Sequence, residues 1–177
     1  MNSVFIAMSL DGFIADKDGK IDWLHSIPNP DNDDMGYNEF MGRTDAIVMG
    51  RKTFETVLGF GIEWPYSRPV FVLSRSMKAV PHELQDHVEL VSGPLPEVIT
   101  WIHTKGHRHL YIDGGRTIQS FLQEDLIDEL VVSTIPIVLG GGSPLFGALG
   151  HPLSFELVDS KTYLNAIVQR RYRRQKE

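Results

Sequence analysis

Hydrophobic residues occur along this chain in short continuous runs, and a polar turn follows most of them. The runs at residues 4–8, 45–49 and 69–73 contain mainly valine, isoleucine, phenylalanine and other apolar residues, a composition that favours strands. Since polar and apolar residues do not alternate inside these runs, we predict strands buried on both faces, as in a parallel sheet. Runs at 88–91, 110–113 and 128–139 predict three further strands.

Segments with apolar residues at helical spacing lie between these strands. They predict helices over residues 35–42 and 95–105, and further helices that begin close to Gly50 and Thr117. Strands and helices therefore alternate with short connections, which indicates an α/β fold with a mostly parallel central sheet and helices on both faces. Residues 155–158 and 163–169 predict a C-terminal hairpin that adds antiparallel strands at one edge.

Length and composition narrow the class of protein. At 177 residues, with 42% hydrophobic and 23% charged residues, the chain is expected to form a single domain over 1–177. The formal net charge of -6 argues against a general nucleic-acid or membrane-surface binder. No cysteine is present, which excludes disulfides and thiolate chemistry. The N-terminus lacks the pattern of a signal peptide, so we expect a cytoplasmic protein.

Two adjacent glycines, Gly114 and Gly115, separate the strand at 110–113 from the helix after it. Glycines at such a turn let the backbone approach a bulky group closely, and the free N–H groups and dipole of the new helix favour an anion such as phosphate. A Gly-Gly turn without a ligand explains the same residues. The G-x-G-x-x-G spacing of dinucleotide-binding proteins is absent.

Two other strands end in residues suited to a phosphate. Residues 50–53 place Arg51 and Lys52 in the first turn of a helix, where cations oppose the helix dipole unless they hold an anion between them. A plain solvated turn is the alternative. Ser74 and Arg75 follow the strand at 69–73. Ligand sites of open α/β sheets lie at the carboxyl ends of strands, so three such ends together predict a binding site.

No pattern in the sequence predicts a metal site. The aspartates of residues 28–34 lack the spacing of a calcium loop and are expected to cap the next helix. His103, His107 and His109 are predicted to form a surface cluster. The basic run at residues 170–174 is interpreted as the solvated end of an edge strand, where charge discourages aggregation.

Four sequence blocks, at residues 6–14, 49–55, 72–75 and 112–115, together resemble the dihydrofolate reductase superfamily over nearly the whole chain. The block at 49–55 is similar to the phosphate-binding signature of true dihydrofolate reductases. Other segments, above all residues 114–140, are more similar to the C-terminal reductase domain of the bifunctional riboflavin-biosynthesis proteins (RibD). The resemblance implies a dihydrofolate-reductase-like three-layer α-β-α fold.

The resemblance also implies an NADPH site spread over these blocks. Ala7 and Ile14 would meet the nicotinamide carboxamide through backbone groups. The remaining implied cofactor residues are Gly50, Arg51, Lys52 and Thr53 on the pyrophosphate and adenosine side, Leu73, Ser74 and Arg75 at the 2′-phosphate, and Asp113, Gly114, Gly115, Arg116 and Thr117 closing over the pyrophosphate. Asp11, Trp23 and Phe40 would contact the substrate, although an ordinary core aromatic explains Trp23 equally well.

Two departures from the family pattern bear on the reaction. Gly36 stands where dihydrofolate reductases carry the helix carboxylate that binds the pteridine, and the nearby Asp33, Asp34 and Glu39 are out of register. Asp113 stands where dihydrofolate reductases have glycine and the riboflavin-pathway reductases have an acid. It is the expected catalytic residue, binding substrate or relaying a proton, and capping of the next helix is its alternative role.

The resemblance therefore implies an NADPH-dependent reductase of a small heterocycle, similar to 5-amino-6-(5-phosphoribosylamino)uracil reductase. Two alternatives stay open: a dihydrofolate reductase, and an NADPH-binding protein without turnover. The expected partner is a small-molecule substrate, with no nucleic acid, membrane or metal. A homodimer is also expected, with residues 140–146 and the hairpin at its edge.

Overall fold

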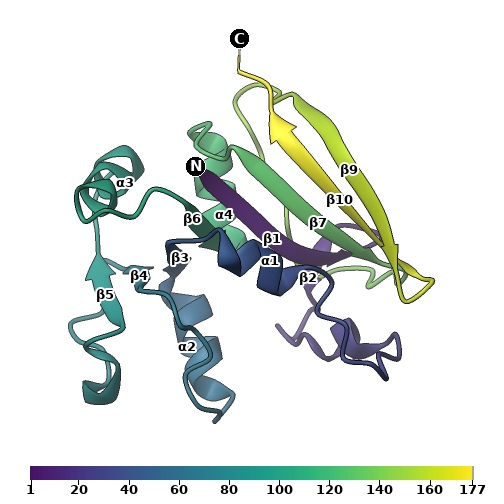
Figure 1. Cartoon of the computed structure of the whole chain (residues 1–177), viewed down its shortest axis with the longest axis horizontal. Helices are drawn as coiled ribbons and strands as arrows, with labels where there is room; N and C mark the ends of the chain where they lie inside the picture. The colour runs from purple at the N-terminus through teal and green to yellow at the C-terminus, as the bar shows by residue number, and fades with distance from the viewer. Residues whose placement is uncertain (177) are drawn as a thin grey trace.

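The protein is built on one eight-stranded sheet, which a computed structural model describes over residues 1–176 (Figure 1). The strands of this sheet are β1 (Asn2–Ser9), β3 (Ala46–Gly50), β4 (Val70–Leu73), β5 (Val88–Val91), β6 (Leu110–Asp113), β7 (Glu129–Ile135), β9 (Phe155–Tyr163) and β10 (Ile167–Arg174). Their spatial order is β5-β4-β3-β6-β1-β7-β10-β9. The short strands β2 (Phe13–Ala15) and β8 (Ser143–Pro144) pair separately.

Six strands, from β5 to β7, run parallel, and β10 pairs antiparallel with both β7 and β9. The helices are α1 (Tyr37–Gly42), α2 (Arg51–Gly59), α3 (Leu95–Thr104) and α4 (Gly115–Gln123), with 3-10 turns η1 (Asp22–His25) and η2 (His82–Leu84). The predicted mostly parallel sheet with a C-terminal antiparallel hairpin is confirmed.

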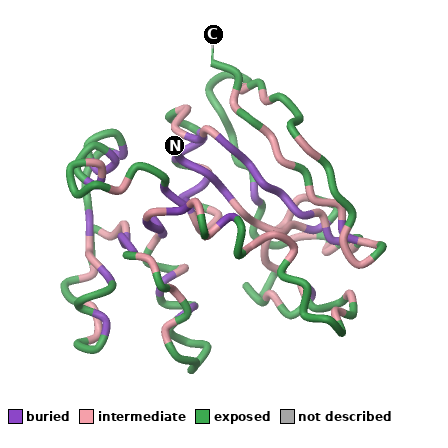
Figure 2. The backbone as a smooth tube through the Cα atoms, in the orientation of Figure 1, coloured by how far each residue is buried: buried purple, intermediate pink, exposed green. Residues whose placement is uncertain are grey.

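Helices cover both faces of the parallel part of the sheet, because successive residues of its strands point to opposite sides. Ile47 and Met49 of β3 pack with Phe54 of α2 on one face, whereas Ala46 and Val48 join the cluster formed with α3 and α4 on the other. Buried backbone follows β1, β3, β6 and β7, and exposure increases toward the outer strand β9 (Figure 2).

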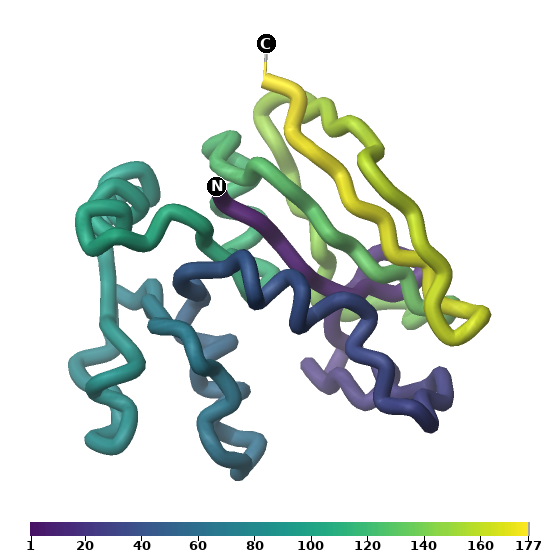
Figure 3. The backbone as a smooth tube through the Cα atoms, in the orientation of Figure 1, coloured from purple at the N-terminus to yellow at the C-terminus, as the bar shows by residue number. Residues whose placement is uncertain are grey.

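The direction in which the chain adds strands reverses next to β1. The chain moves from β3 out to β4 and β5, returns to place β6 between β3 and β1, and then adds β7 on the far side of β1 (Figure 3). Strand β1 pairs with β6 only at Asn2 and Ser3, but it follows β7 all the way to Ser9. The carboxyl-terminal halves of β1 and β6 therefore diverge, which opens the sheet edge where ligands of α/β folds bind.

Strand β7 is shorter than predicted. It ends at Ile135 rather than reaching residue 139, because Pro136 has no N–H to donate to a neighbouring strand. Beyond it the chain turns, with the N–H of Ile137 donating to the carbonyl of Ile135 at 2.8 Å.

The predicted register of the C-terminal hairpin is wrong. The turn lies at Leu164 and Asn165, which both have positive φ (51° and 54°), and not between residues 158 and 163. Strand β9 therefore continues through the polar residues 159–162, and the second strand begins at Ile167. The turn was hard to predict because leucine seldom adopts a left-handed conformation.

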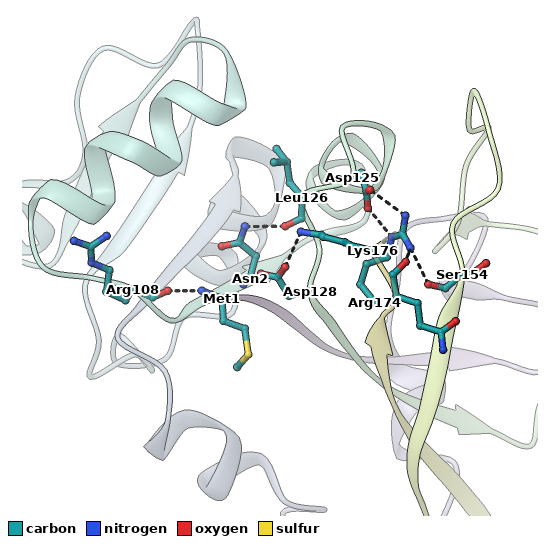
Figure 4. Close-up of polar contacts among 10 residues, drawn as sticks. Met1, Asn2, Arg108, Asp125, Leu126, Asp128, Ser154, Arg174 and Lys176 are labelled. Carbon is teal, nitrogen blue, oxygen red and sulfur yellow. Dashed lines mark hydrogen bonds and ion pairs between the residues drawn. The ribbon is translucent and has the colours of Figure 1, made fainter.

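The interpretation of the basic run as the end of an edge strand is also wrong, because β10 lies between β7 and β9. Arg174 forms a two-point ion pair with Asp125, at 2.7 and 3.0 Å, and its side chain is only 10% exposed. Figure 4 shows this contact within a polar network that joins the two ends of the chain, including Lys176 with Asp128 and the N-terminal amine with the Arg108 carbonyl. Arg174, Lys176 and the N-terminal amine thus hold the two ends of the chain at the edge opposite the candidate site.

No helix in residues 1–176 is long and apolar enough to span a membrane. Over the same residues, no group of three or more histidine or acidic side chains is arranged to hold a metal ion.

Candidate functional site

Three of the strand ends singled out in the sequence are neighbours in the sheet. In the order β4-β3-β6, Gly50 pairs with Leu73, and Met49 pairs with Asp113. Residues 50–53, 73–75 and 113–117 consequently meet at one edge, beside the place where β1 and β6 diverge. The sequence predicted that these strand ends would meet at one sheet edge, and the structure confirms it.

The first turns of α2 and α4 cross in close contact at this edge. A Cβ atom on Gly50 would lie 2.9 Å from Oγ1 of Thr117, and one on Gly114 would overlap Oγ1 of Thr53. Gly114 also has a φ of 92°, which a residue with a side chain adopts only under strain. Two helix N-termini can approach this closely only because glycine precedes each of them.

Both N-termini present free backbone donors. Neither helix has a side-chain cap or an acidic residue in its first turn, so the first N–H groups have no partner within the helix. Arg51 makes a 3.3 Å ion pair with Glu55 along the helix, with both side chains about half exposed. No ion pair within residues 1–176 engages Lys52 or Arg116. The donors and cations together suit an anion.

A groove of about 390 Å³ continues from these turns across the ends of β4 and β5. Its polar lining includes Ser74, Arg75, Ser92, Arg116 and Glu124. The Ser74 hydroxyl accepts from the N–H of Met77 at 2.9 Å, which holds the turn after β4. Arg75 is exposed and has no ion-pair partner within residues 1–176. The groove can therefore accept an extended ligand with a second anionic group.

Asp113 ends β6 on the face that carries α1 and α2. Its carboxylate accepts the N–H of Gly114, the residue before α4, at 2.8 Å, but no side-chain hydrogen bond caps the helix itself, so the alternative capping role is not observed. Burial raises the pKa of Asp113 to about 6, although the hydrogen bond from the Gly114 N–H acts in the opposite direction. A carboxyl group with such a pKa exchanges its proton close to neutral pH, as proton-transfer groups of enzymes do.

Three tyrosines lie near enough to this carboxyl group to be affected by its charge: Tyr37 at the start of α1, Tyr66 in the loop after α2, and Tyr111 in β6. Burial and then the charge of Asp113 raise the pKa of each phenol. The Tyr111 hydroxyl donates to the Phe5 carbonyl at 3.0 Å. The ring centroids of Trp64 and Tyr66 lie 5.2 Å apart. We call Trp64 and these three tyrosines the aromatic cluster.

The predicted nicotinamide residues lie on both sides of the opening. Ala7 is half-buried on β1 and packs in the cluster that contains Trp23. Ile14 packs onto the turn before α4, where a Cβ atom on Gly115 would lie 2.6 Å from its Cδ1 atom. Gly115 thus leaves room for Ile14.

The three predicted substrate residues have different surroundings. Asp11 accepts the Ser9 hydroxyl at 2.6 Å and the N–H groups of Leu139 and Gly140 at 3.1 and 2.8 Å. These bonds lower its pKa and join the loop after β7 to the turn after β1. Phe40 is buried among Phe5 and Tyr111 in the core. Trp23 is 9% exposed, and its indole Nε1 is buried without a partner in the described chain.

The aromatic cluster was missed in the sequence analysis. Residues 59–69, which are rich in glycine, proline and aromatic residues, were not singled out as part of a site. An unusual density of aromatic residues in a loop was the available signal, because a solvated loop has no need of tryptophan and tyrosine. Their approach to Asp113 depends on the position of β6, which is distant in sequence.

Comparison with known proteins gives the same family as the sequence blocks. The chain is 55% identical to a protein of Shewanella sp. PV-4 whose crystal structure is named "Putative riboflavin biosynthesis protein", with a TM-score of 0.97 over 99% of both chains. It is 34% identical to the uncharacterized protein YwjB of Bacillus subtilis (strain 168) over 167 residues, which is 93% of this chain and 92% of YwjB.

A more distant likeness concerns the fold alone. A diaminohydroxyphosphoribosylaminopyrimidine deaminase/5-amino-6-(5-phosphoribosylamino)uracil reductase of Thermotoga maritima superposes with a TM-score of 0.75 at 15% identity, over 99% of this chain and 56% of that one. The sequence model of the RibD C-terminal domain matches residues 3–169. The chain therefore belongs to the RibD C-terminal domain family.

Proposed function

We propose that this protein is an NADPH-dependent reductase of a small heterocycle, of the 5-amino-6-(5-phosphoribosylamino)uracil reductase type. The observation that carries the proposal is the meeting of two uncapped helix N-termini with a half-buried carboxyl group of raised pKa at one sheet edge. Family membership and the names of the relatives point to the same class of reaction.

The residues present fit a phosphorylated dinucleotide. The closely packed glycines at residues 50 and 114 leave the backbone donors of α2 and α4 open to a pyrophosphate. Arg75, with no ion-pair partner in residues 1–176, would bind a 2′-phosphate from the end of β4. Ala7 and Ile14, beside the opening between β1 and β6, would hold the nicotinamide.

NADPH, when bound, supplies a hydride that adds to the carbon of a C=N or C=O bond and leaves NADP⁺. The same reduction requires one proton at the nitrogen or oxygen of that bond. Asp113 is the group that holds this proton, because burial keeps part of its carboxyl protonated near neutral pH. The aromatic cluster orients a planar ring beside the carboxyl group and limits the access of water.

The test is a turnover assay with the purified protein, NADPH and a panel of aminopyrimidine and pteridine compounds. The proposal expects NADPH to be consumed with at least one aminouracil derivative, and the consumption to disappear in Asp113→Ala. If NADPH binds but no compound of the panel causes its oxidation, the protein is better described as an NADPH-binding protein without turnover.

A dihydrofolate reductase receives less support from the site. Gly36 precedes α1 with a φ of 84° and has no side chain to offer to a pteridine. Asp34 accepts the N–H groups of Gly36 and Asn38, both at 2.9 Å, and Asp33 accepts that of Met35 at 2.8 Å. These acids hold the start of the helix. Tight binding of methotrexate would reverse the preference.

A further inference from the structure

A second cavity lies beneath α1, between this helix and the strands β1, β7, β10 and β9. Its volume is about 90 Å³, and it shares no lining residue with the groove at the ends of β4 and β5. One row of paired residues crosses the four strands and lines it: Phe5, Val131, Arg171 and Asp159. Paired residues of neighbouring strands point to the same face of a sheet. The side chain of Arg171 therefore lies on the face that α1 covers.

Arg171 is the lining residue that the described chain leaves without a partner. It is half-buried, and its Nε atom is inaccessible to solvent and has no hydrogen-bond partner within residues 1–176. No ion pair within these residues engages its guanidinium group. The acid opposite it on β9, Asp159, instead accepts the N–H of Ser160 at 2.9 Å. Because an unpaired polar group away from water costs stability, this guanidinium group calls for an acceptor.

The charged side chains of the lining have an excess of positive charge, although the whole protein has a formal net charge of -6. They are three cations and two acids, namely Arg43, Lys161 and Arg171 against Glu39 and Asp159. Glu39 is exposed on α1. The 3.7 Å contact of Asp159 with Lys161 joins two side chains that are about half exposed, so it is weak.

Lys161 and Arg171 are diagonal neighbours on one face of the sheet. Lys161 pairs with Gln169, two residues before Arg171 on β10, and long side chains in diagonal positions reach one another. Two cations so placed repel each other unless an anion lies between them. The third cation, Arg43, is held in place by Glu129 at 2.5 Å.

The size of the cavity limits the anion that it can hold. Pockets for nucleotides and drug-sized ligands usually exceed about 300 Å³, so a cavity of about 90 Å³ is suited to a group of only a few atoms. The planar guanidinium group of arginine matches two oxygens of a carboxylate or a phosphate. The Tyr163 hydroxyl and the Gln169 amide also line the cavity and add neutral polar groups.

We propose that the cavity beneath α1 is a binding site for a compact oxyanion, a phosphate or a small carboxylate, held by Arg171 and Lys161. The inference is independent of the proposed reductase function. Gln169 donates to the Met35 carbonyl at 3.0 Å and so ties the start of α1 to β10. An anion on the same strand adds to this connection and stabilises the folded protein by mass action.

The test is an NMR titration of the isotope-labelled protein with phosphate and, separately, with malonate, at an ionic strength held constant with sodium chloride. No nucleotide is present. The Nε–H signal of Arg171, assigned by its absence from Arg171→Gln, is expected to move as the anion is added. A response to phosphate alone identifies a phosphoryl site, and a response to malonate alone identifies a carboxylate site.

The dissociation constant is read from backbone signals of the cavity residues, so anions bound at the turns around Gly50 and Gly114 do not contribute. Arg171→Gln should weaken the binding at least about tenfold, as expected for a charged hydrogen bond. Lys161→Gln, an exposed position, should weaken it about threefold and tests the site without disturbing the fold. Arg170→Gln is the matched control, because Arg170 is exposed and adjacent residues of a strand point to opposite faces.

An unmoved Arg171 signal in both titrations would overturn the inference. Equal dissociation constants for the parent protein, Arg171→Gln and Lys161→Gln would do the same, as would an equal loss in Arg170→Gln, which would indicate a general effect of surface charge.

Discussion

Asp113 is the residue on which the chemical proposal depends. It lies at the end of β6, accepts one backbone N–H, and has three tyrosines near it that cannot neutralise a negative charge. Its raised pKa therefore has a physical origin in burial. If Asp113 served only to cap a helix, asparagine would serve equally well. The ionisable carboxyl group therefore calls for a function of its own.

The folded-state pKa of Asp113, about 6, lies above that of an aspartate in an unfolded chain. The folded protein therefore binds more protons, and its stability should fall as pH rises from about 4 to about 6. We predict that Asp113→Asn removes this decrease, which amounts to roughly 2 kcal/mol after allowance for partial exposure to solvent. Urea unfolding at several pH values measures it, and parallel pH profiles of the two proteins would contradict the stated pKa.

At the scale of elements, the crossing of α2 and α4 organises the site. The two helices begin at adjacent strand ends, and Thr53 and Thr117 each fill the space left by the glycine of the other turn. This reciprocal contact brings the free N–H groups of both helices to one place. The arrangement requires residues from two segments more than 60 positions apart in the chain.

Gly114→Ala should be strongly destabilising, because its methyl group would overlap the Thr53 hydroxyl at a positive φ. Gly106→Ala is the matched control, since Gly106 has a φ of 94° and open space around it. We expect Gly114→Ala to cost about 1–3 kcal/mol more than the control. Adding Thr53→Ala should recover most of that difference in thermal unfolding, and no recovery would show that the clash is not its cause.

Most single elements could be predicted from the sequence, because apolar runs and helical spacing are local signals. Strand β5 at Val88–Val91 and the strand end at Asp113 are examples. Features that depend on distant partners were missed. The hairpin turn at Leu164 was misplaced, and the bonds from Leu139 and Gly140 to Asp11 were not foreseen because these residues are distant in sequence. The position of Tyr66 near Asp113 is likewise set by tertiary packing.

At the scale of the whole molecule, the outer strand β9 is left open. Its outer edge has no partner strand in the described chain, and Leu157 and Val158 on it are 54% and 36% exposed. The expected homodimer is therefore proposed to form through β9.

Light scattering should then give the mass of a dimer for the parent protein, and Leu157→Lys should shift it toward the monomer. Val138→Lys provides the control, because Val138 is 66% exposed in the loop after β7. A monomeric parent protein would contradict the proposed dimer edge.

The cofactor site is tested most directly by the equilibrium binding of NADPH and NADH to the parent protein, to Arg75→Gln and to Arg170→Gln. Arg170 is an exposed arginine on β10 and serves as the control. We expect the parent protein and the control to bind NADPH at least about tenfold more tightly than NADH, and Arg75→Gln to lose this preference. If the parent protein binds neither nucleotide, the strand ends around Gly50 and Gly114 are not a cofactor site, and the reductase proposal is contradicted.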